Sequence, residues 1–319
     1  MDDADSLTTT CANCGKGEES TGDLKACTAC KLVKYCNRDC QIAHRPLHKK
    51  ACKKRAAELY DEALFRDHQT PDDCPICFLP LPLDFGRNAA PQTTGIEIHA
   101  QTTFQSCCGK IICCGCIYAM CQEDRERGGE RGPCAFCRAP MVTSAAEEIQ
   151  RIKRLMEGNN AVAFNQLANT YWTGNLGMPQ DYEKAIELTI RAGELGCQEA
   201  YCNLGNAYVT GRGVEMDKKK AKHYYELAAM NGDAAARFNI GLLEGKAGNV
   251  NRAKKHFVLA AKAGHKESLD RVKRGFMDGI VTKDEYEIAL RVHQQRQDEM
   301  KSGDRDKVRA HMNDGVYVP

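Results

Sequence analysis

Apolar and small residues recur along the rear half of the chain at a fixed spacing. The strings AFNQLANTYWTG, AYCNLGNAYVTG and ARFNIGLLEG begin at Ala163, Ala200 and Ala236, which are 37 and 36 residues apart. A weaker copy, SLDRVKRGFMDG, begins at Ser268. One apolar position is kept in every copy and is occupied by Leu167, Leu204, Ile240 and Val272. A repeat of this period predicts a helical hairpin in each unit.

The second helix of each hairpin has its own register. Ala185, Ala221 and Ala253 occupy one position in it, and Tyr286 takes that position in the weak fourth copy. Four residues earlier stands a residue that can cap a helix, namely Asp181, Asp217, Asn249 and Thr282, the last forming a capping box with Glu285. Small Ala and Gly residues on the facing sides allow the paired helices to approach closely. One pair cannot bury its apolar face alone, so the units must stack.

This pattern resembles the Sel-one-like repeat, a relative of the tetratricopeptide repeat. The resemblance covers residues 159–300 and implies an all-α solenoid of three units plus a weaker fourth unit or cap. In the second copy it is carried by Ala200, Leu204, Gly205, Tyr208, Gly211, Asp217, Ala221, Ala228, Ala229 and Gly232. The third copy has Glu244 where Tyr171 and Tyr208 stand, so we expect different packing there. An ordinary helical bundle would not explain the fixed period.

The front of the chain is rich in cysteine instead. Of the 19 cysteines, all but Cys197 and Cys202 precede residue 138, and we expect those two to be inert core residues. The chain begins without an apolar leader, and its longest apolar run, Ile111 to Cys121, is too short for a bilayer. We therefore expect an intracellular protein, in the cytoplasm or nucleus, with no membrane contact. In such reducing compartments cysteine clusters more often bind metal than form disulfides.

Overall charge narrows the possible partners. The chain has 319 residues and a formal net charge of +2, which excludes a globally basic nucleic-acid binder. One local basic run could touch phosphate, although we interpret it as a solvated helix face: Lys49, Lys50, Lys53, Lys54 and Arg55. Association with nucleic acid is therefore the weakest of the alternatives.

The first cysteine cluster spans residues 11–52 and consists of four ligand pairs. They are Cys11-x2-Cys14, Cys27-x2-Cys30, Cys36-x3-Cys40 and His48-x3-Cys52. Eight such ligands suit two tetrahedral zinc ions. So short a segment has too little apolar surface to fold by burial alone, and metal must supply the missing free energy.

The gaps between these ligands, with the strings YC, CQ and HKKAC, resemble the MYND finger. The resemblance implies two interleaved zinc sites, one of Cys11, Cys14, Cys36 and Cys40 and the other of Cys27, Cys30, His48 and Cys52. His44 is off this pattern and is expected at the surface. MYND fingers recognise short proline-containing peptides through a groove with a Gln and a Trp. Gln41 matches the Gln, whereas Arg45 stands where the Trp is expected.

The second cluster resembles a RING finger with one defect. Cys74-x2-Cys77 and Cys134-x2-Cys137 flank the string SCCGKIICCGC. Lys110 replaces the usual His ligand, and a protonated lysine has no lone pair to donate. The resemblance implies one complete site of Cys74, Cys77, Cys113 and Cys116, and a second of Cys108, Cys134 and Cys137 completed by Cys107 or, less favoured, His99. We expect one or two zinc ions here, with Cys114 and Cys121 left over as buried thiols.

RING fingers that act as ubiquitin ligases use two further residues, and both positions are matched. Ile76 lies between the first two cysteines, where an apolar residue contacts the ubiquitin-conjugating enzyme, and Arg138 follows the last cysteine, where an arginine bridges that enzyme and ubiquitin. Against ligase activity, Ala135 stands where a proline is common, and the linker from Cys77 to Cys107 is long. A zinc-stapled interaction domain is the favoured interpretation.

The sequence thus predicts seven segments: a disordered tail (1–10), a MYND-type finger (11–52), a helical linker (53–73), a RING-like finger (74–138), a helical linker (139–158), the repeats (159–300) and a flexible tail (301–319). Phosphate-loop, nucleophile-elbow and H-E-x-x-H motifs are absent from the sequence, and no catalytic residue is assigned. We expect an adaptor that binds proteins or peptides on the MYND-type finger and on the concave face of the repeats. The alternative is a RING-type ubiquitin ligase whose repeats recruit substrate.

Overall fold

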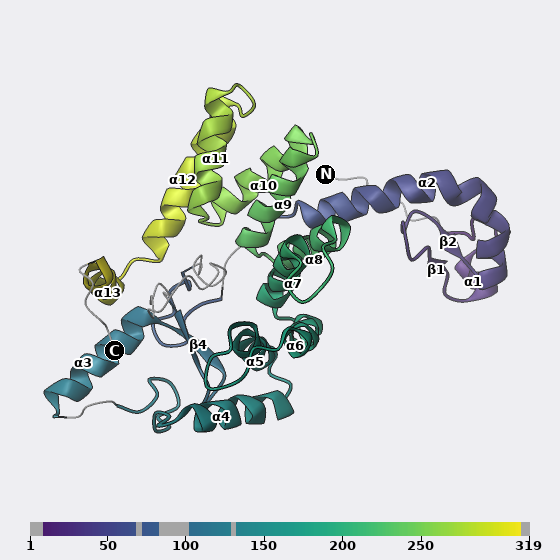
Figure 1. The fold of residues 1–319 in the computed structure, drawn as a ribbon. Coiled ribbons are helices and arrows are strands. Elements are labelled where there is room, and N and C mark those ends of the chain that lie inside the picture. Colours follow the sequence, from purple (N-terminus) through teal and green to yellow (C-terminus); the bar gives the residue numbers. More distant parts are fainter. Residues whose placement is uncertain (1–8, 68–71, 83–101, 129–131, 314–319) are drawn as a thin grey trace. The chain divides into compact units, whose positions relative to one another are not determined.

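The computed structural model describes residues 9–67, 72–82, 102–128 and 132–313. Contacts between Cα atoms divide the chain into two compact units, Met1–Arg66 and Asp67–Pro319. Each unit is described by itself (Figure 1).

The first unit is a small hairpin followed by a long helix. After α1 (Glu18–Thr21), strand β1 (Lys25–Ala26) pairs antiparallel with β2 (Lys34–Tyr35), and α2 (Arg38–Leu64) follows. Asn37 caps α2, because its side-chain oxygen accepts a hydrogen bond from the Cys40 amide at 2.9 Å. Pro46 lies inside α2, where its missing N–H breaks the helical ladder, and the helix is bent (Figure 1). The sequence predicted a helix that begins after Cys52. In the structure this helix begins earlier, at Arg38, within the segment of the first cysteine cluster.

The second unit begins with a similar hairpin and helix. Strand β3 (Thr102–Gln105) pairs antiparallel with β4 (Lys110–Cys113), and α3 (Cys114–Glu126) follows directly. Helix α4 (Ala145–Glu157) then leads into the repeats, and it begins at Ser144, whose hydroxyl accepts from the Glu147 amide at 3.2 Å.

Four helical hairpins form the rest of the second unit, as the repeat predicted (Figure 1). They are α5 (Ala161–Thr173) with α6 (Tyr182–Glu194), α7 (Gln198–Thr210) with α8 (Lys218–Met230), α9 (Ala234–Lys246) with α10 (Val250–Lys262), and α11 (Lys266–Met277) with α12 (Lys283–Glu299). The four apolar residues of the shared position are all buried. The predicted zinc-binding N-terminal part followed by an all-α solenoid is confirmed.

Glycines let the paired helices approach closely, as expected. A Cβ atom on Gly205 of α7 would lie 2.4 Å from the ring of Tyr225 on α8. In the next hairpin, a Cβ atom on Gly241 would lie 2.6 Å from the ring of Phe257. The first helix therefore gives up a side chain at this position so that an aromatic ring of its partner can fill the space.

Three of the four predicted helix caps form. Asp181 accepts from the Lys184 amide at 3.1 Å, Asp217 accepts from the Lys220 amide at 3.0 Å, and Thr282 forms the predicted capping box. The prediction for Asn249 is wrong, since its side chain makes no cap hydrogen bond. Its Nδ2 atom donates instead to Glu244 Oε2 at 2.6 Å.

Glu244 explains this exception and the expected change of packing in the third copy. Its exposed fraction is only 2%, and its carboxylate accepts hydrogen bonds from Asn249, from Lys222 Nζ at 2.7 Å and from Arg252 Nε at 3.3 Å. Burial opposes ionisation, but these donors lower the pKa of Glu244 below its ordinary value. The third unit thus holds a buried ionic cluster where the first two units place a tyrosine.

Part of the range 301–319, for which a flexible tail was expected, is helical. Helix α13 (Gly303–Asn313) forms there and packs against α3, with Val308 buried. The Ser302 hydroxyl accepts from the Arg305 amide at 3.2 Å, and Asp304 and Asp306 lie in the first turn. Such a start signal was present in the sequence, but few apolar residues follow it, so periodicity did not predict the helix.

We expect Gly205→Ala to lower the free energy of unfolding by about 1–3 kcal/mol, because the new methyl group would overlap the Tyr225 ring. Gly245→Ala is the matched control within α9, where the nearest atom would be 3.9 Å away, and it should be neutral or stabilise by up to about 1 kcal/mol. Urea unfolding of both variants measures this difference. Equal effects would show that close helix approach does not limit this position.

Candidate metal centres

The structure brings together all the residues that the sequence predicted as ligands, in four groups of four. The ligand atoms of each group lie within 4.8 Å of one another. The groups are Cys11, Cys14, Cys36 and Cys40; Cys27, Cys30, His48 and Cys52; Cys74, Cys77, Cys113 and Cys116; and Cys107, Cys108, Cys134 and Cys137. In both clusters the pairs interleave, so each group joins two distant parts of its segment.

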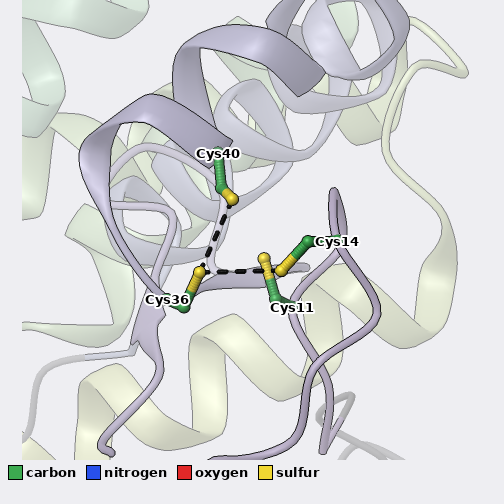
Figure 2. A group of neighbouring side chains, drawn as sticks. All are labelled: Cys11, Cys14, Cys36 and Cys40. Atoms are coloured by element: carbon green, nitrogen blue, oxygen red, sulfur yellow. Dashed lines mark hydrogen bonds between the residues drawn. The ribbon is translucent and has the colours of Figure 1, made fainter. Parts of the chain in front are cut away.

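Figure 2 shows how the first group is built. The sulfurs of Cys11 and Cys14, from the N-terminal loop, point toward those of Cys36, after β2, and Cys40, in the first turn of α2. The Cys36 sulfur is 3.7 Å from that of Cys14 and 3.5 Å from that of Cys40. Sulfurs of a disulfide lie about 2.05 Å apart. A tetrahedral zinc ion with Zn–S bonds of about 2.3 Å holds its sulfurs about 3.8 Å apart, which fits these distances.

The other three groups have similar spacing. The sulfur–sulfur distances are 3.8 Å for Cys27 and Cys52, 3.9 Å for Cys74 and Cys116, 3.8 Å for Cys77 and Cys113, and 3.4 Å for Cys107 and Cys137. In the second group, the Cys30 sulfur lies 3.1 Å from His48 Nε2. Each group therefore has the donor types, the number of donors and the spacing that structural zinc requires.

A stack of rings holds His48 in place. The imidazole of His48 stacks on that of His44 with centroids 5.8 Å apart and planes 14° apart. His44 Nδ1 is in turn hydrogen-bonded to the Tyr35 hydroxyl at 3.0 Å. His44 is outside the four groups, as expected, but it is half-buried behind His48 rather than at the surface.

Four of the five Cys-x2-Cys segments form turns that share one backbone geometry, whereas the fifth, Cys113-x2-Cys116, joins β4 to α3. The residue after the second cysteine has a positive φ in each of these four turns: Gly15, Lys31, Phe78 and Arg138, with φ between 55° and 73°. Its N–H donates to the carbonyl oxygen of the first cysteine at 2.9 Å in all four turns. Three of these residues are not glycine and would rarely adopt such a conformation without a closed turn to hold it.

These turns aim backbone amides at sulfur and so favour thiolates. Burial opposes the ionisation of Cys11, but N–H groups of Cys14, Cys36 and Asn13 lower its pKa to about 6. The same balance between burial and backbone amides lowers the pKa of Cys27 to about 6 and that of Cys74 to about 7.

Some of the other thiols in the groups resist ionisation. Burial and hydrogen bonds with Cys30 and Cys27 raise the pKa of Cys52 to about 12. Four sulfurs in one group cannot all be thiolates without a cation between them, because their charges repel. A divalent metal removes that repulsion and expels the protons, so zinc affinity should fall as pH is lowered.

Lys110 stays out of the fourth group, as its chemistry predicted. Its ammonium lies 5.7 Å from the centroid of the Phe136 ring, and Cys107 completes the group instead. Cys107 and Cys108 are adjacent in the turn between β3 and β4, which Gly109 closes with a φ of 71° and an N–H bond to the Gln105 carbonyl at 2.7 Å. The less favoured substitute, His99, lies outside the described residues.

The remaining cysteines differ in burial. Cys114 and Cys121 are half-buried, where buried thiols were expected, and they belong to none of the four groups. Cys197 and Cys202 are buried in the repeats as expected, and burial raises the pKa of Cys197 to about 12.

The predicted partner-binding residues lie at or near the surface. Gln41 on α2 is half-buried, Ile76 is half-buried against the third group, and Arg138 is exposed. The basic run on α2 is partly neutralised, because Arg55 pairs with Glu62 at 2.7 Å and Lys54 with Glu58 at 3.9 Å. This supports a solvated helix face rather than a phosphate-binding patch.

One residue near a metal group was missed in the sequence. Arg305 of α13 donates from Nη2 to the Cys77 sulfur at 3.4 Å. No motif connects two residues so far apart in the chain. The start signal of α13 was the available clue, and it pointed to a helix but not to its partner.

Family comparisons agree with this geometry. The model of the MYND finger family matches residues 11–52, and that of the Sel1 repeat matches residues 161–197, 198–233 and 234–265. The chain thus carries a MYND finger and three Sel1 repeats, as expected. These assignments support a zinc-binding protein that takes part in protein interactions. The RING-like interpretation of residues 74–138 stays a prediction.

Individual relatives match only parts of the chain. The ERAD-associated E3 ubiquitin-protein ligase component HRD3B of Arabidopsis thaliana is 31% identical over 111 residues, 34% of this chain and 17% of that protein. The SET domain and MYND-type zinc finger protein 6 of Schizosaccharomyces pombe is 41% identical over 51 residues, 16% of this chain and 10% of that protein. The chain thus matches less than a fifth of the length of these curated relatives.

A Sel1 repeat protein from Oxalobacter formigenes is similar in structure, with a TM-score of 0.44 and 21% identity over 56% of this chain and 71% of that chain. Within the described part of the chain, no helix combines the length and the apolar character that crossing a bilayer requires.

Replacing Cys107 by Ser should remove one zinc ion per chain, because the fourth group then keeps three strong ligands, whereas Lys110→Ala should leave the zinc content unchanged. Native mass spectrometry of reduced protein counts the ions. Cys114→Ser is the control for loss of a nearby thiol outside the groups. Loss of zinc in Lys110→Ala with full zinc in Cys107→Ser would contradict the assignment.

Proposed function

We propose that this protein is an intracellular adaptor. Four structural zinc ions, two in each cysteine cluster, fix the conformation of the surfaces that bind other proteins. The observation that carries the proposal is that each metal group contains four protein ligands at tetrahedral spacing. Structural zinc has such closed coordination, whereas catalytic zinc keeps a position open for water or substrate. The sixteen ligands are those of the four groups above. So many thiolates stay available for metal only in a reducing compartment, which supports the cytoplasm or nucleus.

We assign the segments as the sequence predicted them, with two changes. Residues 53–64 of the predicted helical linker over 53–73 continue the helix of the MYND finger, and residues 303–313 form a helix rather than a tail. The RING-like finger over 74–138 and the repeats over 159–300 keep their boundaries. Stacked hairpins present side chains over an extended face, which suits a protein or peptide partner.

The MYND finger offers a second surface for such a partner. Ile42 and Leu47 on α2 have exposed fractions of 57% and 82%, and Leu32 is also exposed. Large apolar side chains exposed on so small a module support contact with another protein. Gln41 lies beside Ile42 in the chain, at the position of the Gln in the peptide groove of MYND fingers, and would contact the same partner.

Chelation should separate the two kinds of domain. Removing zinc with a chelator under reducing conditions is expected to abolish amide protection over residues 11–64, since this segment has little apolar core, while helices α5 to α12 keep theirs. Hydrogen exchange with mass spectrometry measures both regions in one sample. Retention of protection over 11–64 after four ions are lost would contradict a structural role for zinc.

A RING-type ubiquitin ligase is the second candidate. The interleaved third and fourth groups, the half-buried Ile76 and the exposed Arg138 favour it. The relative named as a ubiquitin-ligase component matches over about a third of this chain. Against it, Ala135 stands where ligases commonly have a proline and the linker from Cys77 to Cys107 is long, so we rank this function below the adaptor.

Autoubiquitination with a panel of conjugating enzymes separates the two candidates. The adaptor proposal predicts no ubiquitin chains from the wild-type protein. Chains that disappear in both Ile76→Ala and Arg138→Ala, but persist in Arg127→Ala as a control on an exposed arginine after α3, would replace the adaptor with the ligase.

A further inference from the structure

An arginine from the end of the chain lies against the third metal group. Arg305 is 228 positions from Cys77, yet its Nη2 atom donates to the Cys77 sulfur at 3.4 Å. The exposed fraction of Arg305 is only 6%, so the guanidinium has left bulk water. A buried arginine needs partners for its donors, and around Cys77 both Nη1 and Nη2 of Arg305 find them, whereas its Nε has none among the described residues.

Three backbone carbonyls fix the position of this guanidinium. Nη1 donates to the Pro80 oxygen at 2.8 Å and to the Met300 oxygen at 2.9 Å, and Nη2 also donates to the Leu79 oxygen at 3.4 Å. Leu79 and Pro80 directly follow the Cys74–Cys77 turn, while Met300 follows α12. The planar guanidinium therefore ties the loop beside the metal group to the end of the solenoid.

The helix that carries Arg305 lies directly on α3. A Cβ atom on Gly115, next to the ligand Cys116, would lie 2.8 Å from Arg305 Cγ and 2.9 Å from its backbone nitrogen. Val308, one turn further along α13, is buried as well. The absence of a side chain at Gly115 thus lets the backbone of α13 cover the start of α3.

The positive charge of Arg305 is suited to its contact with the third metal group. Four thiolates around one zinc ion carry a net charge of minus two, and Cys74 and Cys113 of this group are almost fully buried. Buried negative charge is costly unless cationic donors surround it. A guanidinium bound to one of the sulfurs offsets part of that charge and holds the sulfur in its ligating position.

We propose that Arg305 is a positioning residue of the third metal group, and that α13 is the cover that slows the exchange of its zinc ion. This inference rests on the proposed binding of zinc by Cys74, Cys77, Cys113 and Cys116. It makes the RING-like finger discontinuous in sequence, because residues 303–313 belong to it although the whole solenoid lies between.

Zinc release from the full-length protein into excess chromogenic chelator tests the proposal. In Arg305→Met, which keeps the apolar stem but removes the donors, one zinc ion per chain should leave about 10–100-fold faster than in wild type, with the others unchanged. Arg309→Met is the matched control, since Arg309 lies on the same helix, is exposed and pairs with Asp306 at 3.4 Å. It should release zinc like wild type.

A second variant keeps the proposal testable if Arg305→Met misfolds. Val308→Asp should undock α13, and Arg305 with it, without changing Arg305 or any ligand in the sequence, and it should speed the same single phase. Circular dichroism checks that the repeats remain folded in each variant. Wild-type release kinetics in both folded variants would overturn the proposal.

A further variant distinguishes a failure of the proposed role of Arg305 from a failure of the proposed zinc site. Cys77→Ser is introduced into the wild type and into Arg305→Met. In each background it should remove the one zinc ion whose release Arg305→Met accelerates, as counted by native mass spectrometry. If Cys77→Ser removes no zinc from wild type, the proposed site itself fails. If it removes one ion, but Arg305→Met does not change the release rate, only the role of Arg305 is overturned.

Discussion

The fold of the cysteine-rich part of this protein depends on the coordination of a divalent metal by thiolates. In the first unit, three of the five residues of the buried cluster are cysteines, Cys11, Cys27 and Cys30, and only Leu24 and Tyr35 add bulk to them. So small a core cannot offset the entropy lost when a chain of this length folds. The tight Cys-x2-Cys turns, with non-glycine residues at positive φ, persist because a metal ion fixes the sulfurs they present.

The repeats are stabilised by a different kind of contact. Their hairpins bury one apolar residue of each first helix and fit an aromatic ring of the second helix against a missing side chain, as at Gly205 and Tyr225. The third unit keeps this fit at Gly241 and Phe257, but it has Glu244 where the first two units have a tyrosine, and Glu244 forms a buried ionic cluster with its cationic partners. Stability therefore comes from the units together with the contacts between neighbouring units, and the solenoid can present a long surface without a central core.

The sequence was sufficient for the ligand groups and for the period of the solenoid, because both are local patterns with strict geometric requirements. The lack of a lone pair excluded Lys110, and Cys107 was favoured over His99 as its substitute. The cap at Asn249 does not form because the Nδ2 atom of Asn249 donates to Glu244, which holds the side chain in another orientation. Helix α13 was missed because it is mostly polar, and the contact of Arg305 with Cys77 joins residues 228 positions apart, which no periodicity reveals.

Zinc X-ray absorption on the intact, reduced protein tests the central claim most directly. The four groups together supply fifteen cysteine sulfurs and one histidine nitrogen, so the average zinc ion should have a shell of sulfur at about 2.3 Å with at most a trace of nitrogen. A shell with oxygen or nitrogen in place of much of the sulfur, or protein that folds over residues 11–52 while holding no zinc, would contradict it.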